Sequence, residues 1–120
     1  MCGILGAINI PLKQSVLDLL AHRGPDGEGN LVLPVAGHQV SLGHRRLAIV
    51  DLSENGRQPM ASPDQRHWLV YNGEIYNHAD LRGALQGSAF RAHSAPETLL
   101  EPLSRRGVAS PGELNGIFAF

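Results

Sequence analysis

Short apolar runs, each closed by glycine, proline or a polar turn, constrain the fold of this chain more than any other feature. The first run, Cys2–Ile10, has the length and composition of a buried strand, and Pro11 stops it. The next break, Gly24-Pro25-Asp26-Gly27, consists of the residues that turns prefer. We therefore expect short strands with a few helices.

Strands are expected to dominate the chain. They are predicted at the apolar runs bounded by turn residues, namely 2–10, 31–33, 40–50, 67–71, 89–93 and 117–120. A polar loop is expected over 53–59. Because the helices are few and segregated from the strands, the predicted class is α+β.

Three short helices are predicted from capping residues and apolar spacing. Ser15 is expected to cap the first and Asn77 the second, because these residue types accept hydrogen bonds from exposed helical amides. Pro96 suits the first turn of the third helix, whereas Pro102 is expected to interrupt it at a cost of about 3 kcal/mol unless the helix kinks. The first two helices are expected to turn inward Val16, Leu17, Leu19, Leu20, Leu81 and Leu85.

The composition narrows the classes of function. With 120 residues, 42% hydrophobic and 18% charged, the chain is one globular domain or part of one. A formal net charge of -1 without a basic block argues against a nucleic-acid surface. No apolar run approaches the roughly eighteen residues of a membrane helix, and no secretory signal opens the sequence. A single cysteine excludes an internal disulfide, so a reducing, cytoplasmic setting is expected.

Neither a metal site nor a cofactor is expected in this chain. Six histidines are present, but none forms a helical i, i+4 pair and no second cysteine exists, so the sequence does not favour zinc. His44 is instead expected to shape the strand beside Arg46 by hydrogen bonding. No glycine-rich phosphate loop is present, so the chain by itself is not expected to bind ATP.

Cys2 is the candidate nucleophile. Removal of Met1, which is favoured when the second residue is small, would place a thiol and an α-amine on the same residue. The unperturbed pKa of an α-amine is roughly 7.7–8.0, so this amine can accept the thiol proton near neutral pH. Taken alone, however, Cys2 fits a plain buried thiol better, because free cysteine is often buried.

Six sequence motifs favour a catalytic role for Cys2 over a structural one. They are Met-Cys-Gly-Ile-Leu-Gly at 1–6, His-Arg-Gly-Pro-Asp-Gly at 22–27, Gly-His-Arg-Arg-Leu-Ala-Ile-Val-Asp at 43–51, Gln-Pro-Met at 58–60, Tyr-Asn-Gly-Glu-Ile-Tyr-Asn-His at 71–78 and Leu-Asn-Gly-Ile-Phe-Ala-Phe at 114–120. In this order and spacing the sequence closely resembles the glutaminase domain of asparagine synthetases, which are class II glutamine amidotransferases. The resemblance covers residues 1–120, as the N-terminal portion of that domain.

The resemblance implies an N-terminal-nucleophile hydrolase fold, with two stacked antiparallel sheets flanked by helices. It also implies that Cys2 attacks the side-chain amide of glutamine, that ammonia leaves, and that water hydrolyses the thioester to glutamate. Asn72 and Gly73 match the family's oxyanion hole, a side-chain amide and a backbone amide aimed at the developing charge. From the residues alone, Asn72-Gly73 after a strand fits an ordinary tight turn equally well.

Substrate-binding positions also follow from the resemblance. Arg46 matches the arginine that binds the substrate's α-carboxylate, a role suited to a planar, permanently charged group. Arg45 points to the opposite face of an alternating strand and is expected at the surface. Arg23-Gly24-Pro25-Asp26 matches the segment beside the nucleophile, and a structural turn with an internal ion pair is an equal alternative. The other matched pocket positions are Leu47, Ala48, Ile49, Val50, Asn72, Gly73 and Glu74.

One position departs from the family pattern. The family carries Ser-Asp-x-Glu at the start of the third helix, where the aspartate binds the substrate's α-ammonium group. This chain has Ala95 in place of that aspartate, within Ser94-Ala95-Pro96-Glu97. Alanine cannot accept a hydrogen bond, and one charge-assisted bond is worth roughly 1.5–3 kcal/mol. Either another group supplies the acceptor, or the substrate lacks a free α-amine, or activity has decayed.

The chain is also shorter than the family's glutaminase domain, which normally precedes an ATP-using synthetase domain. No synthetase domain is present, so the chemistry that uses ammonia is expected in another domain or subunit. A stand-alone short protein is expected to cover its open sheet edge by forming a homodimer. Two functions are weighed: a glutaminase that supplies ammonia, and a non-catalytic module that acts as a scaffold or subunit.

Overall fold

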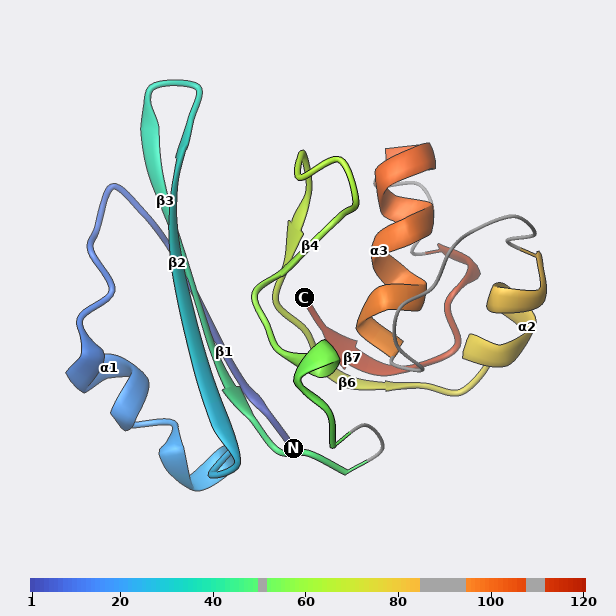
Figure 1. Ribbon diagram of the computed structural model, residues 1–120, viewed down its shortest axis with the longest axis horizontal. Helices are drawn as coiled ribbons and strands as arrows, with labels where there is room; N and C mark the ends of the chain where they lie inside the picture. Colours follow the sequence, from blue (N-terminus) through green and yellow to red (C-terminus); the bar gives the residue numbers. More distant parts are fainter. Residues whose placement is uncertain (50–51, 85–94, 108–111) are drawn as a thin grey trace.

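A computed structural model describes residues 1–49, 52–84, 95–107 and 112–120 (Figure 1). Along the chain the elements are β1 (Gly3–Ile8), α1 (Gln14–Asp18), the 3-10 turn η1 (Ala21–Arg23), β2 (Gly27–Val35), β3 (His38–Arg46), η2 (Glu54–Gly56), β4 (Met60–Ala61), β5 (Trp68–Leu69), β6 (Asn72–Ile75), α2 (His78–Ala84), α3 (Ala95–Arg106) and β7 (Gly116–Ala119). We name residues 1–49 the first half and the described residues from 52 onward the second half.

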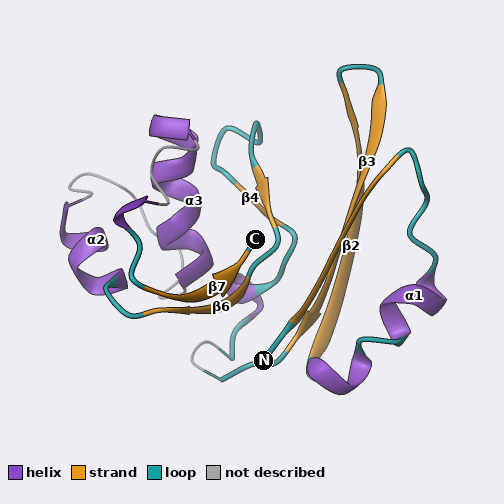
Figure 2. Cartoon of the chain, turned by 180° about the vertical axis from the view of Figure 1, so that it is seen from behind, coloured by secondary structure: helices purple, strands orange, loops and turns teal. Residues whose placement is uncertain are grey.

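The first half is a three-stranded antiparallel sheet in the order β1-β3-β2. β2 and β3 form a hairpin paired along all nine residues of β2. Its turn is Ala36-Gly37, where both residues have positive φ (50° and 81°), the backbone that suits the twist of a tight hairpin. Figures 1 and 2 both place α1 on the side of this sheet that faces away from the second half.

The second half contains two short antiparallel pairs, β4-β5 and β6-β7, together with α2 and α3. Its strands are two or four residues long, so most of its cohesion comes from side chains. The buried apolar cluster consists of Leu69, Tyr71, Ile75, Leu99 and Leu100. α3 supplies two of these residues and thereby packs the helix against the strands (Figure 1).

The mixture of antiparallel sheets and a few helices confirms the α+β class. Within the described chain the strands form three separate sheets, of three, two and two strands. The arrangement of two stacked sheets, which the resemblance implies, therefore stays a prediction.

α3 runs without interruption through Pro102, from Ala95 to Arg106. The predicted break at this proline is wrong. Pro102 is itself buried, and neighbouring Leu99 and Leu100 are almost fully enclosed in the core. Packing of the apolar face offsets the lost backbone hydrogen bond, because tertiary contacts supply most of a helix's stability in a folded protein.

Asn72 and Gly73 lie in a strand rather than in a tight turn. They pair with Ala119 and Phe118 of β7, in the register that continues through Ile75. Gly73 has φ +147°, and a Cβ at this position would collide with the backbone of β7. This backbone requires glycine. The strand predicted over 117–120 is confirmed as β7, one residue earlier.

Neither predicted helix cap forms. α1 begins after Lys13, without any side-chain cap, so Ser15 lies inside the helix. Of its apolar residues only Leu17 is buried, whereas Leu19 is 72% exposed. The Asn77 side chain donates to the Glu113 carbonyl and accepts from the amide of residue 115. Asn77 therefore tethers the segment before β7 instead of capping α2.

The strand predicted over 40–50 is displaced toward the N-terminus and ends at Arg46. Leu47, Ala48 and Ile49 follow it as irregular chain. The predictions for Val50, for Leu85 and for a strand at 89–93 lie outside the described residues. No helix in the described part of the chain is long and apolar enough to cross a membrane.

Candidate active site

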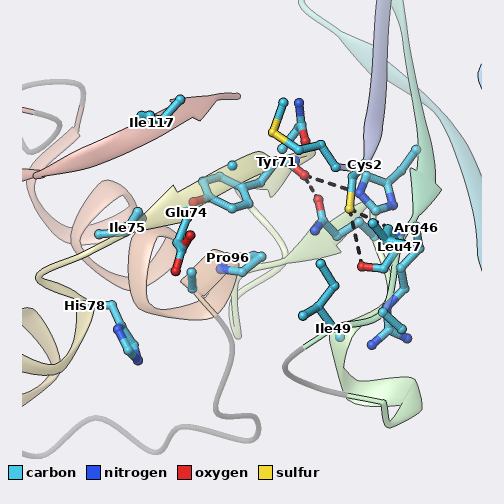
Figure 3. Close-up of a pocket in the computed structure, with 18 of the residues that line it drawn as sticks. Cys2, Arg46, Leu47, Ile49, Tyr71, Glu74, Ile75, His78, Pro96 and Ile117 are labelled. Atoms are coloured by element: carbon cyan, nitrogen blue, oxygen red, sulfur yellow. Dashed lines mark hydrogen bonds between the residues drawn. The ribbon is translucent and has the colours of Figure 1, made fainter. Parts of the chain in front are cut away.

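A cavity of about 390 Å³ lies where the first half meets the second half (Figure 3). Its volume falls in the range of small-molecule sites, which is about 300–1,000 Å³. The first half contributes Cys2 and the residues from His44 to Ile49, except Arg45. The second half contributes β6, the start of α3, and single residues such as Gln58 and His78. The site therefore depends on both halves.

Cys2 lies directly before β1 and is half-buried at the cavity wall. The backbone amide of Leu47 donates to Cys2 Sγ at 3.3 Å, and the thiol can donate to the Leu47 carbonyl at 3.8 Å (Figure 3). Arg23 Nε donates to the Cys2 carbonyl oxygen at 3.0 Å. Both ends of the residue are thus fixed. Met1 is 67% exposed.

The segment from Arg23 to Asp26 supports the site through hydrogen bonds to the nucleophile residue and to the chain after β3. Arg23 holds Cys2, as described above, whereas Asp26 Oδ2 accepts from the amide of Ala48 at 2.9 Å. The amide of Asp26 also donates to the Arg46 carbonyl. The alternative of an internal ion pair between Arg23 and Asp26 is wrong, because each side chain bonds elsewhere. Asp26 fixes the chain that forms one cavity wall.

Arg46 and Arg45 leave β3 on opposite sides. Arg46 lines the cavity, and its Nη1 donates to the Ser53 carbonyl at 2.9 Å. Arg45 turns away toward α1 and forms ion pairs with Asp18 and Glu28. Its side chain is only 13% exposed, so the expectation of a simple surface residue is wrong. The pairing holds α1 against β2 and leaves Arg46 as the arginine at the cavity.

The remaining predicted wall residues also reach the cavity. Leu47, Ala48 and Ile49 line it directly after β3 ends. Ile49 is 73% exposed and stands at the rim. The irregular chain places backbone groups of this segment against the cavity, since Leu47 already contacts the thiol through its amide and carbonyl.

β6 brings Asn72, Gly73 and Glu74 to the same cavity. Asn72 Oδ1 is buried and has no hydrogen-bond partner among the described residues. Buried polar groups in native proteins are nearly always paired, so this amide oxygen is a site that accepts a hydrogen bond from a ligand or a water in the cavity. The Glu74 carboxylate is exposed and lies on the same wall (Figure 3).

Tyr71 and Ala95 form the apolar part of this wall. Ala95 packs against the cluster that contains Tyr71, and both residues line the cavity. The Tyr71 hydroxyl is buried without a partner in the described chain. Burial, followed by the nearby Glu74 and Cys2 groups, raises the pKa of Tyr71 to about 12. The phenol is therefore neutral at physiological pH.

His44 is the most deeply buried ionisable group at the site, with 1% of its surface exposed. Burial lowers its pKa to about 4, opposed by a hydrogen bond to the Tyr71 carbonyl and reinforced by the charge of Arg46. This imidazole is neutral above about pH 5. Among the described residues no group of three or more His, Cys, Asp or Glu side chains is placed to hold a metal ion.

Sequence reasoning singled out neither Gln58 nor Tyr71, although both line the cavity. Each belongs to a quoted motif, Gln-Pro-Met and Tyr-Asn-Gly-Glu. Their membership of those motifs was the available signal. Gln58 is neither charged nor nucleophilic, and it acts by accepting a hydrogen bond from the backbone N–H of Tyr71.

The class of this protein follows from a match to a known family. Residues 1–120 match the family of glutamine amidotransferase domains, and the chain belongs to that family. The cavity, with a cysteine at position 2 on its wall, lies within the matched region.

Particular relatives are asparagine synthetases. The chain is 36% identical over 132 residues to glutamine-hydrolysing asparagine synthetase 1 of Bacillus subtilis, and 41% identical over 133 residues to synthetase 3 of that organism. It is 40% identical over 131 residues to a probable glutamine-hydrolysing asparagine synthetase of Dictyostelium discoideum. Each match covers 100% of this chain but 20%, 21% and 23% of the relative. The chain thus spans about a fifth of the length of these relatives.

Proposed function

We propose that this chain hydrolyses the side-chain amide of glutamine, or of a related amide, through a thioester on Cys2. One observation carries the proposal: Cys2, Arg46 and Asn72-Gly73, from three distant segments, line one cavity of suitable size. The matched family and the glutamine-hydrolysing relatives support the same reaction. An N-terminal-nucleophile arrangement of the sheets is part of this proposal.

The chemistry begins with the Cys2 thiol. After removal of Met1, the free α-amine takes the thiol proton while Sγ attacks the amide carbonyl carbon. The amine then returns the proton to the leaving nitrogen, the carbon–nitrogen bond breaks, and ammonia departs. Water attacks the thioester, releasing glutamate and restoring the thiol. The Leu47 amide, 3.3 Å from Sγ, stabilises the thiolate during the attack.

The negative charge that develops on the carbonyl oxygen needs donors. The Asn72 side-chain amide and the Gly73 backbone amide are assigned that role, since both lie on the β6 wall of the cavity. One such donor is typically worth about 2.7–4 kcal/mol in the transition state. The donor on Asn72 is its side-chain nitrogen Nδ2, because the amide oxygen can only accept a hydrogen bond.

Arg46 is proposed to bind the substrate's α-carboxylate. The wall formed by Leu47, Ala48 and Ile49 would enclose the carbon chain, and Glu74 would face the α-amino end. The fully charged, planar guanidinium suits a carboxylate. Its hydrogen bond to Ser53 fixes the guanidinium before substrate arrives.

A second candidate is hydrolysis of an amide whose α-amine is absent or blocked. Ala95 and Pro96 supply an apolar stretch of wall where a carboxylate would favour a free ammonium group. A non-catalytic module is the third possibility. Kinetic measurements distinguish these alternatives. An enzyme for amides without a free α-amine prefers such substrates to glutamine, whereas a scaffold shows no turnover with any amide.

The ammonia is proposed to serve an ATP-using synthetase domain or subunit. The relatives bear the name of glutamine-hydrolysing asparagine synthetases, and this chain matches only about a fifth of each. No cofactor is proposed for this chain. A cysteine nucleophile needs a reducing compartment, so the cytoplasm is the proposed location.

Glutamate release by the purified protein tests the proposal. We expect turnover of glutamine in a protein whose first residue, by intact mass, is Cys2. Cys2→Ala should show none, and Ala95→Asp should lower KM for glutamine by about 10- to 100-fold. Faster turnover of N-acetylglutamine than of glutamine would favour the second candidate. No turnover of either amide by the correctly processed protein would contradict hydrolysis altogether.

A further inference from the structure

The backbone N–H and the backbone carbonyl of Tyr71 are each bonded to a buried side chain. The N–H donates to Gln58 Oε1 at 2.6 Å, and the carbonyl oxygen lies 3.3 Å from His44 Nε2. The three residues are 3%, 8% and 1% exposed respectively. Because a carbonyl only accepts hydrogen bonds, Nε2 of the neutral imidazole must be the donor. Figure 3 shows Tyr71 and Cys2 on neighbouring walls of the cavity.

Tyr71 lies in a gap between two strands. β5 ends at Leu69 and β6 begins at Asn72, so Tyr71 belongs to neither named strand. The two side-chain hydrogen bonds replace the backbone hydrogen bonds that a neighbouring strand would otherwise make. They fix the chain at the residue directly before Asn72-Gly73, the two proposed oxyanion donors.

The two holding residues come from different places. His44 lies on β3, two residues before Arg46, so both side chains leave the same face of that strand. Gln58 lies in the loop between η2 and β4. His44 therefore links the strand that carries the arginine to the start of the strand that carries the oxyanion donors, across the boundary between the two halves.

We propose that His44 and Gln58 are positioning residues that aim Asn72 and Gly73 at the substrate carbonyl. The inference rests on the proposed glutaminase reaction and adds two residues to it. Neither residue has to touch the reacting atoms. Since oxyanion donors act mainly in the transition state, their misalignment lowers kcat more than it raises KM. A displacement of about 1 Å can cost about 100-fold in rate.

Variants of His44 provide the main test. His44→Leu removes the donor and should lower kcat for glutamate release by about 10- to 100-fold, with KM changed less than about threefold. His44→Gln places a side-chain amide near the original Nε2 and should restore most of the activity. His38→Leu is the matched control, because His38 lies exposed on the same strand and should leave both parameters unchanged.

Alkylation of Cys2 by iodoacetamide separates positioning from general damage. That reaction needs the thiol but no oxyanion hole, so the His44 variants should react at the wild-type rate. If His44→Leu does not fold, Gln58→Asn serves instead, since it withdraws the acceptor by one methylene and keeps a polar amide. It should lower kcat by at least about threefold with alkylation unchanged.

Three outcomes would overturn the inference. One is full kcat in a folded His44→Leu protein, or in Gln58→Asn when His44→Leu does not fold. Another is a loss confined to KM. The third is an equal loss of alkylation and turnover, which would show that these residues support the thiol or the fold. Absence of turnover in wild-type protein would refute the proposed reaction itself and this inference with it, so the two failures are told apart.

Discussion

The two halves of the molecule are built in different ways. In the first half, β3 is paired along its whole length and its backbone ladder fixes the register. In the second half, strands of two and four residues are joined by a compact apolar cluster and by side chains that bond to backbone groups. Gln58, His44 and Asn77 supply such bonds. The nucleophile therefore lies beside a long strand ladder, whereas the proposed oxyanion donors lie on a four-residue strand that depends on side-chain contacts as well as on its pairing with β7.

The difference between the halves indicates which part of the site is more sensitive to substitution. Cys2 and Arg46 lie at the same end of the long β1-β3 pair, whereas the residue that leads into Asn72 and Gly73 is held by two side chains, each of which a single substitution can remove. The departure from the family pattern, Ala95, also falls in the second half. Damage to the second half should therefore affect both stability and the proposed chemistry more than equal damage to the first.

Leu99→Ala should have the largest effect on stability. Leu99 is fully buried, and truncation of such a residue costs about 2–5 kcal/mol. Urea unfolding should show this loss, and hydrogen exchange should show it first in β6 and β7. Leu19→Ala is the control, since a side chain that is 72% exposed should change stability by less than about 0.5 kcal/mol. Equal loss of protection in β2 and β6 would contradict the contrast between the halves.

Gly73→Ala should cost about 2–4 kcal/mol. The residue has φ +147° and would place its Cβ against the backbone of β7, so β6 and β7 must separate. Thermal unfolding measures the loss, and glutamate release should fall with it. Gly83→Ala is the matched control in α2, where no atom is close and alanine favours the helix by about 1 kcal/mol. A Gly73→Ala protein as stable as wild type would show that β6 adopts another backbone.

His44 should make the contact between the halves sensitive to acid. Its folded pKa of about 4 lies below the ordinary histidine value of 6.5, so between these values the unfolded chain binds a proton that the native state does not. Stability is therefore complete above pH 6.5 and lost as pH falls toward 4, by about 2 kcal/mol between pH 7 and pH 5. Urea titrations at both pH values measure this loss of stability. His44→Gln should remove the part of the loss that is due to the imidazole. An identical pH dependence in the variant would assign the effect to other groups.

Asp18→Asn should have the smallest effect. The substitution removes one of the two ion pairs of Arg45. This pair lies in the first half, outside the cavity. Because Asp18 is 55% exposed, the cost should stay below about 1 kcal/mol, with kcat and KM unchanged. A large loss of activity would show that the Arg45 cluster also orients Arg46.

The sequence allowed the α+β class and the positions around the cavity to be predicted, because each motif is contiguous and follows or begins an apolar run. Every predicted site residue that the structure describes lines the cavity, although the roles stay predictions. Details set by tertiary contacts were not accessible. Pro102 stays in a helix because the core encloses it, and Asn77 bonds to a segment more than thirty residues away.

Gln58 illustrates the same limit within the site. Its importance depends on the backbone N–H of Tyr71, thirteen residues further on, and no local pattern places the two together. The short strands β4 and β5 bring them into contact. A side chain that holds backbone has no chemical signature of its own in a sequence, unlike a nucleophile or an arginine.

Glutamate release by Asn72→Ala, measured beside Cys2→Ala, tests most directly whether both halves serve one reaction. The two side chains line the same cavity from opposite halves. Cys2→Ala should show no turnover, and Asn72→Ala should lower kcat by about 100- to 1,000-fold with little change in KM. Wild-type kcat in a folded Asn72→Ala protein would contradict the assignment of the second half to catalysis.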